Sequence, residues 1–440
     1  MSSMSVWGYP AAALPQFEKA DSIVRLSTEQ ASWFASLLIL MCIPGAVIAA
    51  SIYEKFGPRR MFLALTPVLC LSFMAMALAS LQTIANTGLA QIILLACRVV
   101  QGAAVALTNS VINVYVYEIC ELRIRGIMTS LSEFSSSLGY LICYFLACFF
   151  SWDQIALIIS TVVILPSFIG VIISPESPLW LARTGKEEEA KRVMKTVRRT
   201  EKEILSDLEA ASRNKNESAT YRESLQILTK KPNLKAMIAS SLIFIFNQLT
   251  GYSIVTLYVV HIFEAARAGL PAQWSSVIVG TCRPVISALT AYLLHTSSRR
   301  FLLALGCTFT GIANGIIGTY FFLQHMEYDL SSLNWLPLFG LVLYMIGYSG
   351  FVGPTTWSAG VEVLPESVRS IGYGIGITCY SITAFLLSKF FVDLKIILGM
   401  HGMFWLFSGG SFIFAAVTLL YIPETLGKSL DDINDYWEKH

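Results

Sequence analysis

The sequence predicts an all-α membrane protein in which about eleven complete helices cross a bilayer. Three observations support this fold class: an apolar composition, recurring apolar stretches of membrane-spanning length, and basic residues gathered on one side of those stretches. Hydrophobic residues make up 55% of the 440 positions and charged residues only 14%. A soluble core cannot absorb so much apolar surface, so the chain is expected to reside in lipid.

The apolar stretches form two groups on either side of a polar segment. A helix needs about 20 apolar residues to cross a hydrocarbon core of about 30 Å. The first half contains such stretches near residues 33–53, 61–81, 89–118, 126–148 and 154–173. The second half contains them near residues 234–262, 272–294, 300–323, 335–362, 371–392 and 402–421. The expected organisation is an N-terminal helical bundle (1–182), a cytosolic linker with short amphipathic helices (183–233) and a C-terminal helical bundle (234–440).

The basic residues predict the orientation of the chain. Of the 31 Lys and Arg residues, 24 lie on one side of the predicted spans, and most of these fall in the polar segment. The loops at 82–88, 151–153, 263–271, 324–334 and 393–401, on the other side, are short and hold only Arg267 and Lys395. Positively charged loops remain in the cytosol, so the central linker and the C-terminus are expected there. The chain is expected to be a multi-pass protein of the plasma membrane.

Composition also argues against several classes of function. The net charge of +2 is nearly neutral, and nucleic acid is not expected as a partner. The nine cysteines lie in or beside apolar stretches with no CxxC pair, which indicates packing residues rather than a disulfide or metal framework. No nucleophile, phosphate-binding loop or metal-ligand cluster is recognisable in the sequence. We therefore expect no enzyme activity, no cofactor and no metal, and a monomer whose partners are lipid and a small solute.

An internal repeat with an offset of about 240 residues relates the two halves. Three motifs recur: Arg59-Arg60 as Arg299-Arg300, Glu118 with Arg125 as Glu362 with Arg369, and Pro175-Glu176-Ser177 as Pro423-Glu424-Thr425. Gly8-Tyr9 likewise matches Gly251-Tyr252, whose predicted span begins well upstream of the glycine. The first helix is therefore expected to be truncated, with its inner half upstream of Met1. Parallel repeats of this kind meet at a substrate site near the middle of the bilayer.

Loop motifs carry a resemblance to a known family over almost the whole chain. The most specific are Pro-Glu-Ser-Pro-Leu-Trp-Leu at 175–181 and Pro-Glu-Thr-Leu-Gly-Lys-Ser-Leu at 423–430, and a third is Glu-Lys-Phe-Gly-Pro-Arg-Arg at 54–60. Together they resemble the sugar porter family of the major facilitator superfamily, and most closely the insect facilitated trehalose and hexose transporter-like proteins. The resemblance implies the major facilitator fold of two six-helix bundles. It also implies transport of a sugar, a hexose or trehalose, by alternating access, with facilitated transport favoured.

The resemblance further implies a network of carboxylates and guanidiniums on the cytosolic side. Arg presents a rigid fork to a carboxylate, and bonds that break when the inner side opens favour the outward-facing state. The alternative is that these charges face headgroups and only set the topology. The expected members are the acids Glu54, Glu118, Glu176, Glu362 and Glu424 and the arginines Arg98, Arg125, Arg299, Arg300 and Arg369.

A substrate site is implied on the seventh and tenth helices. Asn247, Gln248 and Ser253 match family positions whose amides hydrogen-bond sugar hydroxyls, and an amide suits hydroxyls because it both donates and accepts. Trp357 matches the aromatic ring that stacks on the sugar, since the C–H faces of a pyranose bury well against a ring. For each polar residue the alternative is a contact that only joins helices.

Gating residues are implied by the same resemblance. Tyr258 matches a tyrosine of the outer gate, on the same helix as Gln248. Gly353 and Pro354 match the bend of the tenth helix, where the backbone is expected to flex during gating.

Two ionisable residues, Glu133 and Arg283, lie inside predicted spans. An ionisable group that faces lipid costs roughly 2.5 kcal/mol or more, so each is expected to face the cavity or a partner. Both fall where the resemblance places neutral substrate-binding side chains. One hypothesis pairs them across the cavity, and another makes Glu133 the proton carrier of a sugar symporter.

Three functions stay open at this point. Facilitated sugar transport is the leading interpretation. A transport-incompetent relative, a sugar sensor or a truncated gene product is the second, because half of the first helix is expected to be missing and the second Arg-Arg loop at 295–300 has lost its acid and its glycine. A carrier of an anionic solute, anchored by Arg283, is the third.

Overall fold

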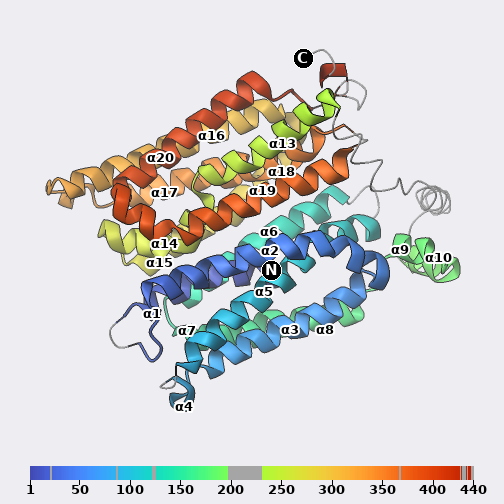
Figure 1. Cartoon of the computed structure of the whole chain (residues 1–440), viewed down its shortest axis with the longest axis horizontal. Coiled ribbons are helices and arrows are strands. Elements are labelled where there is room, and N and C mark those ends of the chain that lie inside the picture. Colours follow the sequence, from blue (N-terminus) through green and yellow to red (C-terminus); the bar gives the residue numbers. More distant parts are fainter. Residues whose placement is uncertain are drawn as a thin grey trace.

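The computed structural model consists of helices and loops in the residues that it describes, which are 1–19, 22–85, 88–120, 125–196, 230–365, 368–426, 428, 433 and 435–437. No strand occurs in these residues. At some helical positions, Arg125 and Glu133 among them, only the backbone is described. Figure 1 shows two bundles of long helices, one formed by the first half of the chain and the other by the second half.

The first bundle is built from helices of the first repeat. In chain order these are α1 (Ser2–Phe17), α2 (Thr28–Phe56), α3 (Pro58–Leu78), α5 (Leu89–Ile119), α6 (Arg125–Leu146) and a last helix made of α7 (Trp152–Ile158), a π-helical segment (Ile159–Ile164) and α8 (Leu165–Ile173). The short α4 (Gln82–Ala85) lies between α3 and α5. Beyond α8 the chain forms α9 (Pro178–Arg183), which ends where the predicted linker starts, and α10 (Glu187–Thr196), which lies within that linker.

The second bundle repeats this plan. Its helices are α13 (Lys231–Leu249), α14 (Tyr252–Ala266), α15 (Ala272–Thr296), α16 (Arg299–His325), α19 (Arg369–Lys389) and α20 (Phe391–Tyr421), together with a helix made of α17 (Leu336–Gly347), a π-helical segment (Tyr348–Val352) and α18 (Gly353–Glu362). A short 3-10 helix (Ser331–Leu333) precedes α17.

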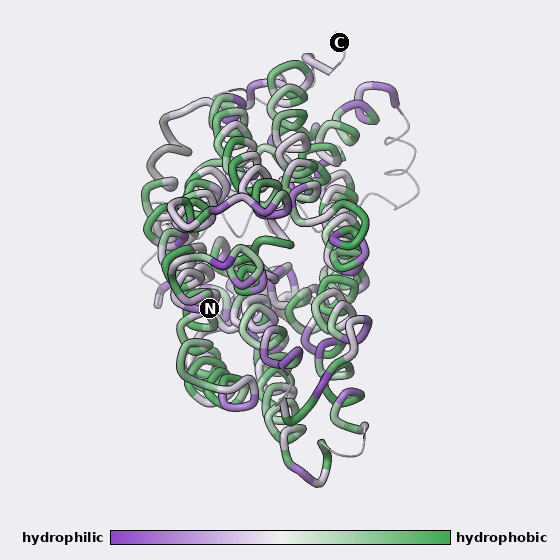
Figure 2. Tube along the Cα trace, turned by 90° about the vertical axis from the view of Figure 1, so that its left-hand side faces the viewer, coloured by the Kyte–Doolittle hydropathy of each residue, from purple (hydrophilic) through white to green (hydrophobic). Residues whose placement is uncertain are grey.

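The predicted all-α membrane fold is confirmed, because each predicted span coincides with one of these helices or, for 234–262, with α13 and α14 together. Nine helical stretches of the described residues are long and apolar enough to cross a membrane, and α6 contributes a shorter apolar stretch, so eleven is an approximate count. Large apolar side chains are exposed on the outside, for example Leu420 at 85%. Figure 2 shows hydrophobic residues along most of both bundles, and so much apolar surface requires lipid around it.

The bundles meet through helix pairs that the repeat relates to one another. The helix α1 packs against α14, and the equivalent pairs α2 with α19 and α6 with α15 flank this contact. The Tyr144 hydroxyl of α6 donates to the Thr256 carbonyl at 3.0 Å, and Lys389 Nζ of α19 donates to Ser32 Oγ of α2 at 2.8 Å. In Figure 1 the bundles lie closest near α1, α14 and α15 and spread toward α9 and α10. We call the end that carries α9 and α10 the linker end, and the opposite end the far end.

Gly251 makes the break between α13 and α14. Its φ of +90° lies in the left-handed region, and an added Cβ would lie 2.7 Å from the Phe407 ring of α20. Gly251→Ala is expected to lower the melting temperature of the purified protein by several degrees, because backbone strain of about 1–2 kcal/mol adds to a steric clash. Gly409→Ala is the matched control, since nothing lies within 4 Å of its added Cβ. Equal melting temperatures for the two variants would contradict this account.

Candidate functional site

Asn247, on the last turn of α13, connects three helical segments of the second bundle. Its Nδ2 donates to Thr356 Oγ1 of α18 at 2.9 Å, and its Oδ1 accepts from the Tyr348 hydroxyl at 3.1 Å. The side chain is almost completely buried. Because both ends of the amide have protein partners, Asn247 joins α18 to α13 in this structure. This arrangement corresponds to the alternative in which the polar residue makes a contact between helices.

Gln248, the next residue, is bound at only one end of its amide. Ser253 Oγ donates to Gln248 Oε1 at 2.6 Å, across the break at Gly251. Gln248 Nε2 is buried and has no hydrogen-bond partner among the described residues. A buried amide group without a partner costs free energy, so a ligand that accepts from this nitrogen gains the missing bond. Ser253 therefore orients Gln248, and Nε2, which the Tyr380 hydroxyl also approaches, remains available to donate to a solute.

Trp357 lies on the turn of α18 that contacts this part of α13. It directly follows Thr356, the partner of Asn247, so Trp357 and Gln248 occupy contacting turns of α18 and α13. The Trp357 ring packs against Phe244 and Tyr380, with ring centres 5.5 and 5.3 Å apart, and 40% of the residue remains exposed. A partly exposed indole on the turn that contacts the Gln248 helix combines an apolar platform with a polar handle, as sugar binding requires.

Arg283 of α15 lies at the junction of the two bundles. Its Nη2 donates to the Tyr252 hydroxyl at 2.7 Å, and its Cζ lies 4.3 Å from the centre of the Tyr140 ring of α6. Tyr252 in turn stacks on Tyr348, with ring centres 4.1 Å apart and 6° between the planes. Aromatic faces attract a cation by about 2 kcal/mol when the site is desolvated. The guanidinium is thus held in a box of tyrosines that spans both bundles.

These tyrosines were missed in the sequence, although one signal was present. Tyr140 lies two helical turns beyond Glu133, on the same face of α6. A residue that shares a face with a predicted cavity residue is itself a candidate. The side chain of Glu133 lies outside the described residues, so its pairing with Arg283 stays a hypothesis.

Tyr258 and the pair Gly353 and Pro354 lie at breaks in helices. Tyr258 has non-helical dihedral angles within α14, and its ring stacks on Phe391 with centres 4.1 Å apart. Its hydroxyl donates to the Ser388 carbonyl at 3.4 Å. Gly353 and Pro354 begin α18 directly after the π-helical segment. Such segments are where helices bend, which is compatible with the predicted gating positions.

The first network at the linker end is centred on Glu118. Its side chain is only 4% exposed, and its Oε2 accepts from the Tyr53 hydroxyl at 2.6 Å and from Ser177 Oγ at 2.5 Å. Its Oε1 lies 3.5 Å from Arg183 Nη2. Arg183 was not predicted as a member of this network. The available signal was its position just after the Pro-Glu-Ser motif, two residues beyond Leu181.

Other predicted members join this first network through the backbone. Glu176 Oε1 accepts from the backbone N–H of Arg59 at 3.0 Å. The Glu54 carbonyl accepts from Trp180 Nε1 at 3.0 Å, while the Glu54 carboxylate plays no part in that bond. The side chain of Arg125 lies outside the described residues. Among the described residues, Glu176 and Glu54 therefore join the motif loops through bonds that involve a backbone group.

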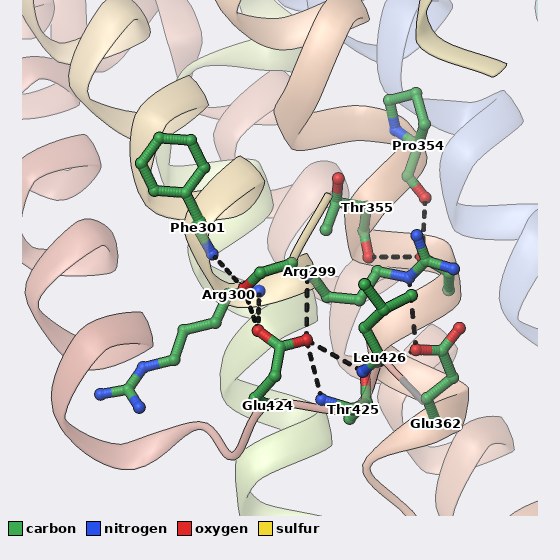
Figure 3. Close-up of polar contacts among 11 residues, drawn as sticks. Arg299, Arg300, Phe301, Pro354, Thr355, Glu362, Glu424, Thr425 and Leu426 are labelled. Atoms are coloured by element: carbon green, nitrogen blue, oxygen red, sulfur yellow. Dashed lines mark hydrogen bonds and ion pairs between the residues drawn. The ribbon is translucent and has the colours of Figure 1, made fainter. Parts of the chain in front are cut away.

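The second network repeats this arrangement, as Figure 3 shows. Glu362 Oε2 accepts from Thr425 Oγ1 at 2.5 Å and lies 3.4 Å from Arg299 Nε. Thr425 thus takes the place that Ser177 has beside Glu118. The Glu424 carboxylate caps the N-terminus of α16, where it accepts from the backbone N–H groups of Arg299 and Arg300 at 3.0 and 3.2 Å. A carboxylate is stabilised there by unpaired N–H groups and the helix dipole.

Two of the predicted arginines have contacts that differ from the predicted pairing of a guanidinium with a carboxylate. Arg369 donates to the Leu364 carbonyl at 3.3 Å, and Glu362 has Arg299 as its ion-pair partner instead. The Arg300 side chain points away from Glu424 in Figure 3, so this residue takes part through its backbone N–H.

The assignment of Arg98 to the network was wrong. Arg98 is fully buried, with Nε donating to the Phe34 carbonyl and Nη1 to the Val6 carbonyl, each at 3.1 Å, and Nη1 also to Gln101 Oε1 at 2.9 Å. The helix α5 begins at the far end, and Arg98 precedes Glu118 by 20 residues, which is about 30 Å along a helix. Arg98 instead ties α1 and α2 to α5 inside the first bundle.

Glu424 provides a pH-dependent contribution to stability. Burial raises its pKa, but hydrogen bonds from Ser298 and from the backbone N–H groups of Leu426, Arg299 and Arg300 outweigh this effect, so its pKa is lowered. A carboxyl whose pKa is lower in the folded state stabilises that state above its unfolded pKa of about 4.3. The stabilisation is lost as pH falls through the lower, folded pKa.

Glu424→Gln is therefore expected to lower the melting temperature at neutral pH and to lower it progressively less as the solution is acidified toward pH about 4. Thermal unfolding of the purified protein over a pH series measures this difference. Glu188→Gln is the control, because its carboxylate is exposed and only meets Lys191 on the surface of α10. A loss that does not shrink in acid would show that the charge of Glu424 is not responsible.

Comparison with known proteins agrees with this geometry. The family model described as Sugar (and other) transporter matches residues 3–437. The facilitated trehalose transporter Tret1-2 homolog of Drosophila sechellia is 28% identical over 413 residues, which cover 93% of this chain and 82% of that protein. The facilitated trehalose transporter Tret1 of Drosophila pseudoobscura pseudoobscura is also 28% identical over 412 residues, and this chain spans 46% of its length.

Solved structures share the fold. The inward open structure of the xylose transporter XylE from E. coli has a TM-score of 0.82 at 16% identity, covering 99% of this chain and 97% of that one. This likeness establishes the fold, which is the predicted arrangement of two helical bundles. Since the family model matches nearly every residue from the first helix to the C-terminal segment, this protein belongs to the Sugar (and other) transporter family.

Proposed function

We propose that this protein carries a sugar, a hexose or trehalose, across a membrane by facilitated alternating access. The observation that carries the proposal is the Gln248 amide, whose buried Nε2 has no hydrogen-bond partner among the described residues, together with the partly exposed Trp357 on the contacting helix. Family membership and relatives named as facilitated trehalose transporters support a sugar over the sensor and anion alternatives. Transport requires no bond chemistry, so we propose a carrier and not an enzyme.

The proposed site binds a sugar by complementary polar and apolar contacts. Gln248 Nε2 donates to a hydroxyl of the sugar, and Ser253 keeps the amide in the right orientation. The Trp357 ring covers an apolar face of the pyranose. The guanidinium of Arg283, held between Tyr140 and Tyr252, supplies further donors from the bundle junction.

Alternating access follows from the contacts at the two ends. Contacts across the bundle junction at the far end include the Glu18–His261 pair at 3.2 Å and the Lys389–Ser32 hydrogen bond. Partly exposed ion pairs contribute about 0–1 kcal/mol each, so thermal motion can break them and open the far end. The described contacts of Glu118 and Glu362 each lie within one bundle, where they hold the linker ends of the helices together while the bundles rock.

The same proposal assigns an orientation. The linker end faces the cytosol because it carries most of the basic residues, and the far end faces the outside. The protein acts as a monomer in the plasma membrane, with the site opening to either side between the two bundles.

Uptake by proteoliposomes tests this function. The purified protein is expected to give saturable uptake of labelled glucose or trehalose, with no stimulation by an inward proton gradient. Uptake of an organic acid alone would instead indicate an anion carrier built on Arg283, and no uptake of any solute would indicate a sensor. Sugar uptake that rises with the proton gradient would restore Glu133 as a candidate proton carrier.

A further inference from the structure

His325 and His401 lie side by side at the far end of the second bundle. His325 is the last residue of α16, and His401 lies on α20 just after its break at Gly399. Their ring centres are 5.3 Å apart, with 24° between the planes. Both line one hollow of about 480 Å³, together with Gln324. Neutral imidazoles are the commonest metal ligands in proteins, so two of them facing one hollow are a candidate site.

The spacing of the two rings fits a single shared ion. A Zn–N bond is about 2.0–2.1 Å long and the ring centre lies roughly 1.1 Å further on, so two imidazoles on one tetrahedral ion have centres about 5 Å apart. The observed 5.3 Å agrees with this value. The rings are stacked with 24° between their planes, so each imidazole must turn about its side-chain bonds to direct a nitrogen toward a shared ion.

The chain holds His401 in this place. Gly399 has a φ of +69°, and an added Cβ would lie 2.7 Å from Cε1 of His401, so the break accepts only glycine. Phe322 and Trp405 flank the His401 ring, with ring centres 5.7 and 5.6 Å from it. A ring restrained by its neighbours loses little freedom when it binds, and this preorganisation favours affinity.

Gln324 offers a third ligand in the same hollow. Its Nε2 donates to the Ala265 carbonyl at 3.0 Å, which orients the amide. Its Oε1 is buried and has no hydrogen-bond partner in the part of the chain that the structure describes. Water can complete the shell, as it does in open zinc sites. The described residues contain no cluster of three or more His, Cys, Asp or Glu side chains, so the affinity is expected to be moderate.

We propose that His325 and His401 form a binding site for a divalent transition metal, in the first place Zn²⁺, that joins the end of α16 to α20. Imidazole ligands suit Zn²⁺, Ni²⁺ and Cu²⁺, whereas Mg²⁺ and Ca²⁺ require oxygen ligands. The bound ion restrains the break at Gly399. The site involves neither Gln248 nor Trp357, so it stands or falls independently of the proposed transport function.

Isothermal titration calorimetry of the purified full-length protein with ZnCl₂ tests the site. One Zn²⁺ per chain is expected to bind with a micromolar Kd at neutral pH, and MgCl₂ is expected to give no binding. His325→Asn and His401→Asn should each weaken Zn²⁺ binding roughly tenfold or more. His261→Asn is the matched control, because His261 lies at the same end but meets Glu18. Acid should weaken binding by the wild type, since the ligand imidazoles must be neutral.

A second readout separates loss of the site from loss of the fold. Asparagine keeps a polar side chain at each position, and the melting temperature without metal reports whether each variant is folded. Zn²⁺ should raise the melting temperature of the wild type and of the His261 variant, but not of the two site variants. Absence of Zn²⁺ binding by the wild type, or unchanged binding by either site variant, overturns the proposal.

Discussion

Glu118→Ala is expected to lower the melting temperature of the purified protein more than any other single change in the linker-end networks. The carboxylate accepts from Tyr53 and Ser177 and pairs with Arg183, and its side chain is almost completely buried. A hydrogen bond to a charged group contributes about 1.5–3 kcal/mol, so losing both hydroxyl partners costs roughly 3–6 kcal/mol. Thermal unfolding in detergent measures the loss.

The repeat supplies the control for this prediction. Glu362 is the equivalent acid of the second bundle, with Thr425 and Arg299 as partners, but its side chain is 34% exposed. Water can replace some of its contacts, so Glu362→Ala should reduce the melting temperature by clearly less. If the two variants were equally destabilised, or in the opposite order, burial would not be what sets the strength of these networks.

Gln248→Ala is expected to reduce kcat/KM for sugar uptake by about 10–100-fold, chiefly through a higher KM. A hydrogen bond from a buried amide contributes about 1–3 kcal/mol to binding, and each 1.4 kcal/mol is a factor of ten. The variant removes both the free Nε2 and the acceptor of Ser253. Initial rates of uptake into proteoliposomes over a range of sugar concentrations separate KM from kcat.

Gln91→Ala is the matched control for this experiment. Gln91 lies on the first turn of α5, where Nε2 donates to the Arg25 carbonyl at the far end, away from Gln248. Its replacement should leave KM unchanged. An unchanged KM for Gln248→Ala as well would mean that the sugar binds elsewhere and that Gln248 only joins helices.

The fold could be predicted because lipid imposes its demands on each helix separately. A spanning helix must satisfy its own backbone hydrogen bonds and carry about 20 apolar residues, and both requirements are visible along a single segment. The repeat could also be recognised from the sequence, since Ser177 and Thr425 occupy the same position of the motif in each half. The structure gives them the same task, donating to Glu118 and Glu362.

Arg98 shows where prediction from a resemblance failed. The orientation of its span already placed the start of α5 next to a short, uncharged loop at the far end. That observation was enough to separate Arg98 from Glu118, because about 1.5 Å of rise per residue keeps residues of one helix at a fixed distance. The physical geometry of the helix was a better guide here than the family pattern.

The order of the helices, their lipid-facing composition, their repeat and the positions of the loop motifs can all be read along the chain. The partners of the polar groups cannot: Gln248 is oriented by Ser253 across a helix break, Arg283 is held by Tyr140 from the other bundle, and His325 meets His401. Hydropathy acts on neighbouring residues of one segment. A hydrogen bond or a ring contact depends instead on how segments far apart in the chain are packed, and small differences in that packing select the partner.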